Sequence, residues 1–314
     1  MQLMADDGGR YEVEGPIAAG AFSMVFKAYK LDDSGGRTSS IPNGDVGGGG
    51  GGGGGPLAVA VKTYDSARCA KFGDLARSRE IEIAVLRRLR EHQLGDAQLG
   101  NAQLGGDGHP HIANMLAEIS TGSATHLILE YCAGGSLDFA LARLRNKRRA
   151  EHSAGGYPED EAAALLYQVT SGLAHLHRLA IAHRDLKPSN LLFVDAQRTR
   201  IKICDFGCAV VCGNRRLRER VIPGARYQSP EVIRYQAPEL CRPLPNLAET
   251  GYLGPPVDLW ALGAVALEVL ETAPLMNTLI TLITLITWGV LWALGAVALE
   301  VLETAPLMTT LIIS

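Results

Sequence analysis

The sequence predicts an α+β fold with two lobes, a small β-rich N-lobe at 11–131 and a larger helical C-lobe at 132–276. Short apolar runs bounded by glycine, proline and polar residues dominate the first part and are typical of strands. Apolar residues at helical spacing dominate the second part, most clearly after Pro158. A chain of 314 residues, 47% hydrophobic and 20% charged, is long enough to bury a sizeable core.

Charge and cysteine content narrow the classes of function and the cellular setting. The formal net charge of -3 gives no electrostatic basis for binding nucleic acid, which requires a basic surface. The six cysteines form no paired disulfide framework, and the polar, acidic start of the chain is unlike a signal peptide. We therefore expect an intracellular protein, cytoplasmic or nuclear.

Cys204, Cys208 and Cys212 are spaced four apart but lack the paired spacing of zinc sites, which disfavours a metal there.

The N-lobe strands are expected in four places. Residues 11–29 read as two strands joined by a turn, and further strands are expected at 56–62, 115–119 and 125–131. In the strand at 56–62 the two-residue period places Ala58, Ala60 and Lys62 on one face. The interval 32–55 ends in nine consecutive glycines, which cannot bury apolar surface, so we expect a flexible insertion.

A helix is expected at about 74–90. Glu82, Leu86 and Leu89 lie at positions i, i+4 and i+7 and share one face, whereas Glu80 points in nearly the opposite direction. Glu82 is therefore the better candidate to pair with a lysine of the sheet. The helix runs into 94–108, where a five-residue pattern repeats in tandem, and we interpret this segment as a second solvated insertion.

The C-lobe is expected to consist mainly of helices. One begins near Ser136 and ends at about Arg149 in a basic turn, which complements the helix dipole and alternatively could dock acidic partners. Pro158 and three acidic residues begin a long core helix. A hairpin is expected at 191–204. A helix that is apolar all round is expected from Asp258 to Leu270, and we expect it to be buried.

The most informative stretch is His183-Arg184-Asp185-Leu186-Lys187-Pro188-Ser189-Asn190, followed by Asp205-Phe206-Gly207. Phosphoryl transfer needs a carboxylate near the attacking hydroxyl and oxygen ligands for magnesium held against the phosphates. Asp185, Asn190 and Asp205 supply that set. The stretch resembles the catalytic and metal-binding loops of the eukaryotic Ser/Thr protein kinase family, and the resemblance covers about 11–276.

The resemblance implies the two-lobed protein-kinase fold and assigns roles to the loop residues. It implies that Asp185 is the catalytic base and that Asn190 and Asp205 hold Mg²⁺. Lys187 stands where the Ser/Thr-specific branch keeps a lysine that steadies the transferring phosphoryl group. The resemblance also implies that Asp258 caps its helix and bonds the catalytic-loop backbone.

The resemblance extends to the nucleotide site. Lys62 ends a V-A-V-K strand similar to the family's V-A-I-K, and it would contact the α- and β-phosphates of ATP with Glu82 as its ion-pair partner. The Gly-rich loop departs from the family pattern, because Ala18 and Ser23 replace its outer glycines. The residues expected to bind the nucleotide are Ile17, Gly20, Val25, Ala60, Lys62, Leu129, Glu130, Cys132, Leu192 and Asp205.

The segment after Asp205 contains a tandem repeat. Residues 226–233 are echoed at once by 234–241, so either copy could be the A-P-E motif of the family. Arg184, together with Arg215, Arg216, Arg218 and Arg220, could receive a phosphate. The hydroxyls within reach are those of Ser229, Tyr227 and Tyr235.

The last part of the chain, 277–314, is a duplicated apolar tail. It copies Leu259–Met276 residue for residue as Leu291–Met308. The later C-lobe helices of the family are not recognisable, so we expect an incomplete C-lobe. The uncharged segment 275–299 is long enough to span a membrane, but its origin as a copied core helix favours a local duplication.

These observations predict a protein Ser/Thr kinase that uses ATP and Mg²⁺ and acts on protein substrates. The alternative is a catalytically impaired, pseudokinase-like protein that binds ATP or serves as a scaffold, suggested by the altered Gly-rich loop and the incomplete C-lobe. A third class, a membrane-anchored kinase, depends on the tail alone.

Overall fold

The computed structural model describes residues 1–19, 23–38, 56–98, 108–151, 156–213, 215–218, 234–241 and 250–270. The chain divides into two compact units: unit 1 is Met1–Gly108 with Ala113–Ala133, and unit 2 is His109–Ile112 with Gly134–Ser314. Gly20, most of the insertion at 32–55, the first A-P-E copy and the tail at 277–314 lie outside the described residues.

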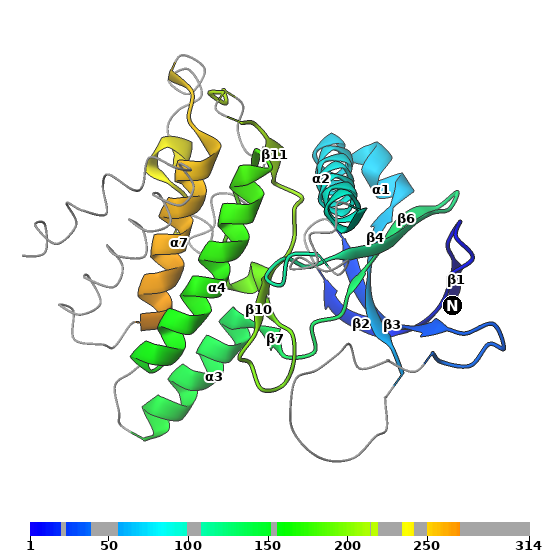
Figure 1. Ribbon diagram of the computed structural model, residues 1–314, viewed down its shortest axis with the longest axis horizontal. Coiled ribbons are helices and arrows are strands. Elements are labelled where there is room, and N and C mark those ends of the chain that lie inside the picture. Colours follow the sequence, from blue (N-terminus) through cyan, green and yellow to red (C-terminus); the bar gives the residue numbers. More distant parts are fainter. Residues whose placement is uncertain are drawn as a thin grey trace, which may run out of the picture. The chain divides into compact units, whose positions relative to one another are not determined.

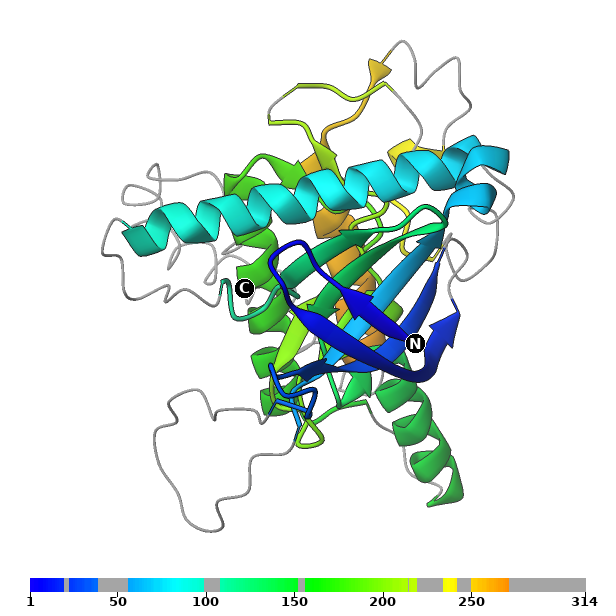
Figure 2. The same ribbon diagram turned by 90° about the vertical axis from the view of Figure 1, so that its right-hand side faces the viewer.

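Unit 1 is built on a six-stranded antiparallel sheet with the strand order β1-β2-β3-β4-β6-β5 (Figures 1 and 2). Its strands are β1 (Gln2–Met4), β2 (Arg10–Ala19), β3 (Met24–Leu31), β4 (Ala58–Asp65), β5 (Met115–Ser120) and β6 (Ala124–Glu130). The strand β1 was not expected, because three residues are too few for a periodic signal. It pairs with the start of β2, where Leu3 lies opposite Tyr11, and both side chains are buried in the core of unit 1.

Two helices accompany this sheet, α1 (Ser66–Lys71) and α2 (Gly73–Gln98). The face of α2 predicted to be apolar is buried, with Leu75, Glu82, Leu86 and Leu89 all inside. The predicted end of this helix was wrong, since α2 continues through 94–98 into the segment interpreted as an insertion. Leucine, alanine and glutamine in that segment are good helix formers, so the helix extends into the repeat.

The described residues of unit 2 form three long helices and several short strands (Figure 1). The helices are α3 (Leu137–Ala150), α4 (Glu159–Arg178) and α7 (Gly254–Leu270), and two 3-10 turns are η2 (Pro188–Asn190) and η4 (Pro238–Cys241). One sheet has the order β10-β9-β7 and another pairs β11 with β8. The strands are β7 (Gly135–Ser136), β8 (Ile181–Ala182), β9 (Leu191–Phe193), β10 (Ile201–Ile203) and β11 (Val210–Val211). The hairpin expected at 191–204 is therefore present as β9 and β10.

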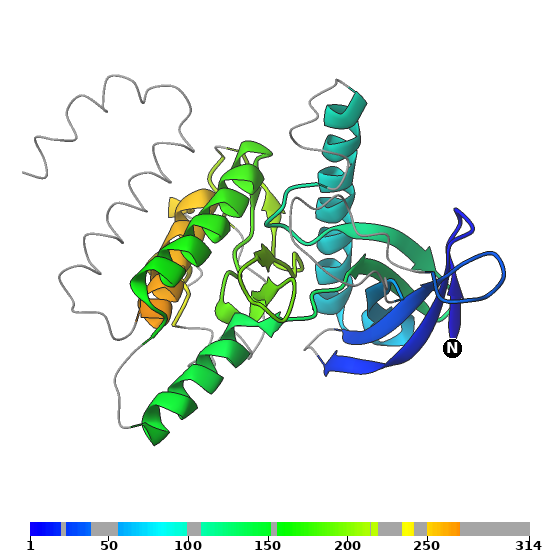
Figure 3. The same ribbon diagram turned by 60° about the horizontal axis from the view of Figure 1, so that its bottom comes forward.

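Helices α4 and α7 lie side by side in unit 2 (Figure 3). Helix α4 begins directly after Pro158, as predicted, and buries the apolar face that its spacing indicates. Helix α7 begins at Gly254 and not at Asp258. Two prolines occupy its first turn, where a missing N–H has no intrahelical partner to lose. Asp258 therefore lies in the second turn and is not a cap, while Trp260 stays 51% exposed on the other side of the helix.

The short segment His109–Ile112 belongs to unit 2, although the chain on both sides of it belongs to unit 1. Ile112 forms a parallel bridge with Ile203, and the Ile203 N–H donates to the His111 carbonyl at 2.9 Å. A side chain at Gly172 of α4 would come within 2.9 Å of that same carbonyl. Glycine is thus required where α4 passes this segment.

The second A-P-E copy is integrated into the fold of unit 2. Ala237 is buried in a cluster with Leu217, Tyr252 and Val257. Among the residues that the structure describes, no helix combines the length and apolar character that crossing a membrane requires.

Candidate active site

Lys62 of β4 and Glu82 of α2 form a buried ion pair in unit 1. The Lys62 ammonium lies 2.7 Å and 2.8 Å from the two carboxylate oxygens of Glu82. Their side chains are only 9% and 1% exposed. The predicted pairing is therefore confirmed, and Glu80 instead contacts Arg79 at the surface. A desolvated pair holds the ammonium in a defined place, as a lysine that contacts phosphates requires.

Tyr64, which the sequence reasoning missed, is a third member of this group. Its hydroxyl donates to the Glu82 carboxylate, and its side chain is buried. Lys62 and Tyr64 are two residues apart in β4, so both point to the same face of the sheet. The two-residue period of the strand could have placed Tyr64 on the same face as Lys62. It could not have identified the acceptor of the Tyr64 hydroxyl, because Glu82 lies on α2.

Several predicted nucleotide-binding residues occupy one face of the unit 1 sheet. Val25 of β3 lies opposite Lys62, and Leu129 of β6 lies opposite Ala60. Opposite residues on antiparallel strands share a face, and so do Ala60 and Lys62. The structure thus places these four side chains on one face of the sheet, where Ala60 has the smallest side chain.

The other predicted nucleotide-binding residues that the structure describes in unit 1 lie near the ends of strands or after them. Ile17 lies near the end of β2 and is 48% exposed. Glu130 ends β6, and its backbone N–H donates to the Asn114 carbonyl at 3.0 Å. A purine contact by Glu130 would therefore use its carbonyl oxygen. Cys132 follows β6 and is half-buried.

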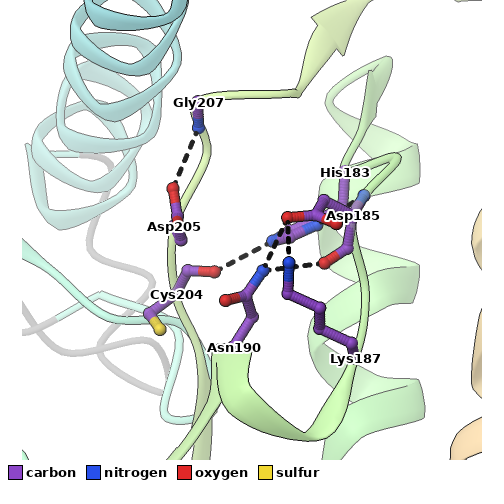
Figure 4. A network of polar contacts seen from close by, with 7 residues as sticks. All are labelled: His183, Asp185, Lys187, Asn190, Cys204, Asp205 and Gly207. Carbon is purple, nitrogen blue, oxygen red and sulfur yellow. Dashed lines mark hydrogen bonds and ion pairs between the residues drawn. The ribbon is translucent and has the colours of Figure 1, made fainter. Parts of the chain in front are cut away.

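In unit 2, Asp185 is held by the two loop residues that the sequence singled out (Figure 4). Its Oδ2 accepts from the Lys187 ammonium at 2.8 Å and from the Asn190 amide at 3.1 Å, and the same amide also donates to the Asp185 carbonyl at 2.8 Å. The Asp185 side chain is still 17% exposed. One carboxylate is thus oriented from two sides while it remains accessible to an acceptor hydroxyl.

His183 joins the catalytic loop to the segment that carries Asp205. The Asp185 N–H donates to His183 Nδ1 at 3.3 Å, so Nδ1 is the acceptor and the ring proton resides on Nε2. Nε2 then donates to the Cys204 carbonyl at 3.0 Å. The Cys204 N–H in turn donates to the Asn190 carbonyl at 3.0 Å. Asp205, the next residue, is thereby fixed relative to the loop (Figure 4).

Asp258 of α7 holds the backbone of the catalytic loop by hydrogen bonds. Its two oxygens accept from the N–H groups of His183 and Arg184 at 2.8 Å and 2.7 Å. The predicted bond to the loop backbone is confirmed, even though Asp258 lies inside the helix. His177 of α4, which the sequence reasoning missed, adds a third contact at 2.8 Å. Burial alone would raise the pKa of Asp258, but these hydrogen bonds outweigh it and hold the pKa below its ordinary value.

The charges around Asp185 modify its acidity. Burial raises the pKa of Asp185, and the Asp205 charge adds to that effect, while Lys187 opposes it. Burial would lower the pKa of Lys187, yet the charges of Asp185 and Asp205 outweigh it and raise the pKa, so the ammonium stays charged. The result is a carboxylate that is more basic than usual, beside a permanent cation.

The donor set near Asp205 fits a magnesium ion. Mg²⁺ prefers oxygen ligands and is usually held by one or two carboxylates together with substrate phosphates. Asp205 and Asn190 supply such oxygens from segments that are hydrogen-bonded to each other. No cluster of three or more His, Cys, Asp or Glu suited to a metal occurs in the described part of the chain, including around Cys204 and Cys208.

Asp205 and Leu192 complete the set of predicted residues in unit 2. Asp205 has a φ of 65°, a left-handed conformation that is uncommon outside glycine, and its carboxylate accepts from the Gly207 N–H at 3.4 Å. Leu192 lies in β9 opposite Lys202 and Ser136. Leu192 is thus placed by backbone pairing within unit 2.

Comparison with known proteins identifies relatives for this arrangement. A family described as "Protein kinase domain" matches residues 100–284. The serine/threonine-protein kinase DCLK2 of Homo sapiens is 31% identical over 209 residues, which is 66% of this chain and 21% of that protein. The serine/threonine-protein kinase DCLK1 of Rattus norvegicus is 33% identical over 159 residues, 50% of this chain and 30% of that protein. A probable myosin light chain kinase of Dictyostelium discoideum is 30% identical over 157 residues, 50% of this chain and 42% of that protein. The matches thus span between 21% and 42% of the length of these relatives.

Proposed function

The chain belongs to the protein kinase family, and from that premise we propose that it transfers the γ-phosphate of ATP to serine or threonine hydroxyls of proteins. The observation that carries the proposal is the orientation of Asp185 by Lys187 and Asn190, with Asp205 tied to the same loop. Phosphoryl transfer depends mainly on positioning and charge stabilisation, and this loop offers both.

The proposed reaction assigns one step to each side chain of the loop. Asp185 accepts the proton of the acceptor hydroxyl while that oxygen forms a bond to the γ-phosphorus. The bond from the γ-phosphorus to its bridging oxygen breaks, and ADP leaves. Lys187, beside the base, stabilises the negative charge of the transferring group. Its presence two residues after the base supports serine or threonine as acceptor.

The proposed ligands of these residues are Mg²⁺ and ATP. Asn190 and Asp205 of unit 2 would hold the ion, which neutralises phosphate charge when bound. Lys62 of unit 1, held by Glu82, would contact the nucleotide phosphates. The sequence has no paired disulfide framework, which supports the proposed reducing, intracellular setting.

The proposal is tested with γ-labelled ATP, Mg²⁺ and mixed peptides that carry serine, threonine or tyrosine. We expect label on serine or threonine and none on tyrosine. Asp205→Asn should abolish Mg²⁺-dependent nucleotide binding, and Lys62→Met should weaken it, whereas Lys71→Met, a surface lysine of α1, should leave it unchanged. Wild-type nucleotide affinity in both Asp205→Asn and Lys62→Met would contradict the assignment. Nucleotide binding without transfer would favour the alternative of an ATP-binding scaffold.

A further inference from the structure

Arg184 belongs to the catalytic loop, and each of its three guanidinium nitrogens donates to an acceptor in unit 2. Its side chain is buried, and Nε donates to the Cys208 carbonyl at 2.8 Å while Nη2 donates to the Ala209 carbonyl at 3.1 Å. Nη1 donates to the Tyr252 hydroxyl at 2.8 Å. All three acceptors are neutral. A guanidinium taken out of water in this way depends on such acceptors to keep its place.

The Tyr252 hydroxyl is presented by a rigid backbone. Tyr252 is 2% exposed and packs in the cluster that contains Leu217 and Val257. Its N–H and carbonyl both bond to Leu217, at 2.8 Å each, in an isolated antiparallel bridge. Gly251 precedes it with a φ of 61°, and a side chain there would come within 2.9 Å of the Leu217 carbonyl. Packing and backbone hydrogen bonds therefore hold the Tyr252 hydroxyl in place independently of its bond to the charged Arg184 guanidinium.

Arg184 links three segments that lie far apart in the sequence. It belongs to the catalytic loop, contacts the two carbonyls directly after Asp205-Phe206-Gly207, and reaches Tyr252, two residues before α7. Its backbone has a φ of 63°, so the loop is held in a strained conformation at the residue before Asp185. Loss of one side-chain partner should therefore affect the position of Asp185 directly.

Phosphates on activation segments commonly order kinase loops by pairing with arginines. The sequence suggested that role for Arg184, but the structure gives its guanidinium other partners. We propose that Tyr252 is a positioning residue that holds Arg184, and through it the catalytic loop, without a phosphate on the segment after Asp205. This inference rests on the proposed kinase function.

The test uses the full chain, treated with a phosphatase and verified by mass spectrometry to carry no phosphate. Wild type is compared with Tyr252→Phe and with the control Tyr167→Phe, which alters an α4 tyrosine that is 67% exposed. Two quantities are measured: kcat and KM for ATP in phosphotransfer, and amide hydrogen exchange in the peptide covering 183–191.

Phosphatase-treated wild type should keep its kcat. Tyr252→Phe should lower kcat by at least about tenfold, the effect of losing a hydrogen bond to a charged group, with little change in KM for ATP. Its exchange in 183–191 should rise, while Tyr167→Phe should match wild type in both measurements.

Two results would overturn the inference. The first is a loss of activity on phosphatase treatment that rephosphorylation restores, which would point to the exposed arginines Arg215, Arg216 and Arg218 as phosphate receivers. This comparison needs no variant, so it decides the matter even if Tyr252→Phe does not fold. The second is wild-type exchange in 183–191 in a folded Tyr252→Phe. Exchange is measured independently of transfer, so a chain without kinase activity would refute the proposed function and still report on Tyr252.

Discussion

Replacing Glu82 with leucine removes one partner from a buried ion pair and should strongly destabilise unit 1. The Lys62 side chain is 9% exposed and would lose the carboxylate with which it pairs. Breaking such a pair from one side costs about 3–5 kcal/mol. Tyr64 also loses its acceptor, which costs up to about 1–3 kcal/mol, although the two losses overlap because they share one carboxylate.

This cost corresponds to a fall in melting temperature of roughly 6–20 °C, taking about 2–4 °C for each kcal/mol. Differential scanning calorimetry and urea unfolding followed by circular dichroism measure it. Glu80→Leu is the matched control on the same helix, because Glu80 contacts Arg79 in an exposed pair at 3.6 Å. An exposed pair contributes about 0–1 kcal/mol, so this control should unfold close to wild type.

The triple variant Lys62→Met, Glu82→Leu, Tyr64→Phe completes the test. It removes both charges and the hydroxyl together, and buried pairs replaced by apolar side chains are often equally stable. It should therefore regain most of the stability that Glu82→Leu loses, while nucleotide affinity stays low. Equal destabilisation by Glu82→Leu and Glu80→Leu, or a triple variant no more stable than Glu82→Leu, would refute the reasoning.

Two further predictions concern unit 2. Asp258→Asn places an amide NH₂ among donors, so it should cost about 3 kcal/mol in urea unfolding and slow phosphotransfer; wild-type stability would contradict the anchoring role. Burial, aided by His175, lowers the pKa of His109 from 6.5 to about 3, so the unfolded chain takes up a proton below pH 6.5 that the folded chain excludes. The stability contributed by neutral His109 is present above pH 6.5 and lost as the pH falls toward 3, and His109→Gln should lose about 2–3 kcal/mol less than wild type between pH 7 and 4.5. Equal acid losses in urea unfolding would refute it.

Local periodicity was sufficient to predict the Lys62–Glu82 pair. The strand period placed Lys62 on one face of β4, and the helix period distinguished Glu82 from Glu80. Both arguments need only the geometry of a single element. The Tyr64 hydroxyl was missed, because a tyrosine in a strand looks like an apolar core residue until its acceptor on another element is known.

Long-range contacts of the loop were predicted less completely. The resemblance indicated that Asp258 bonds the catalytic loop, but the helix was expected to begin at Asp258, whereas the prolines before it occupy the first turn of α7. The partner of Arg184 lies 68 residues later in the chain, and no pattern in the sequence connects the two. The sequence likewise left both A-P-E copies open, and the burial of Ala237 shows that the second is part of the fold.

The comparison of Asp185→Asn with wild type tests the central claim most directly, because the proposed base acts on the acceptor hydroxyl and not on bound nucleotide. Phosphotransfer to a serine or threonine peptide and affinity for Mg-ATP are measured side by side, with Asp195→Asn, a partly exposed aspartate of the same unit, as control. We predict that Asp185→Asn lowers kcat by about a hundredfold or more while nucleotide affinity stays within about twofold of wild type. Equal, nonzero transfer rates for wild type and Asp185→Asn would contradict the account.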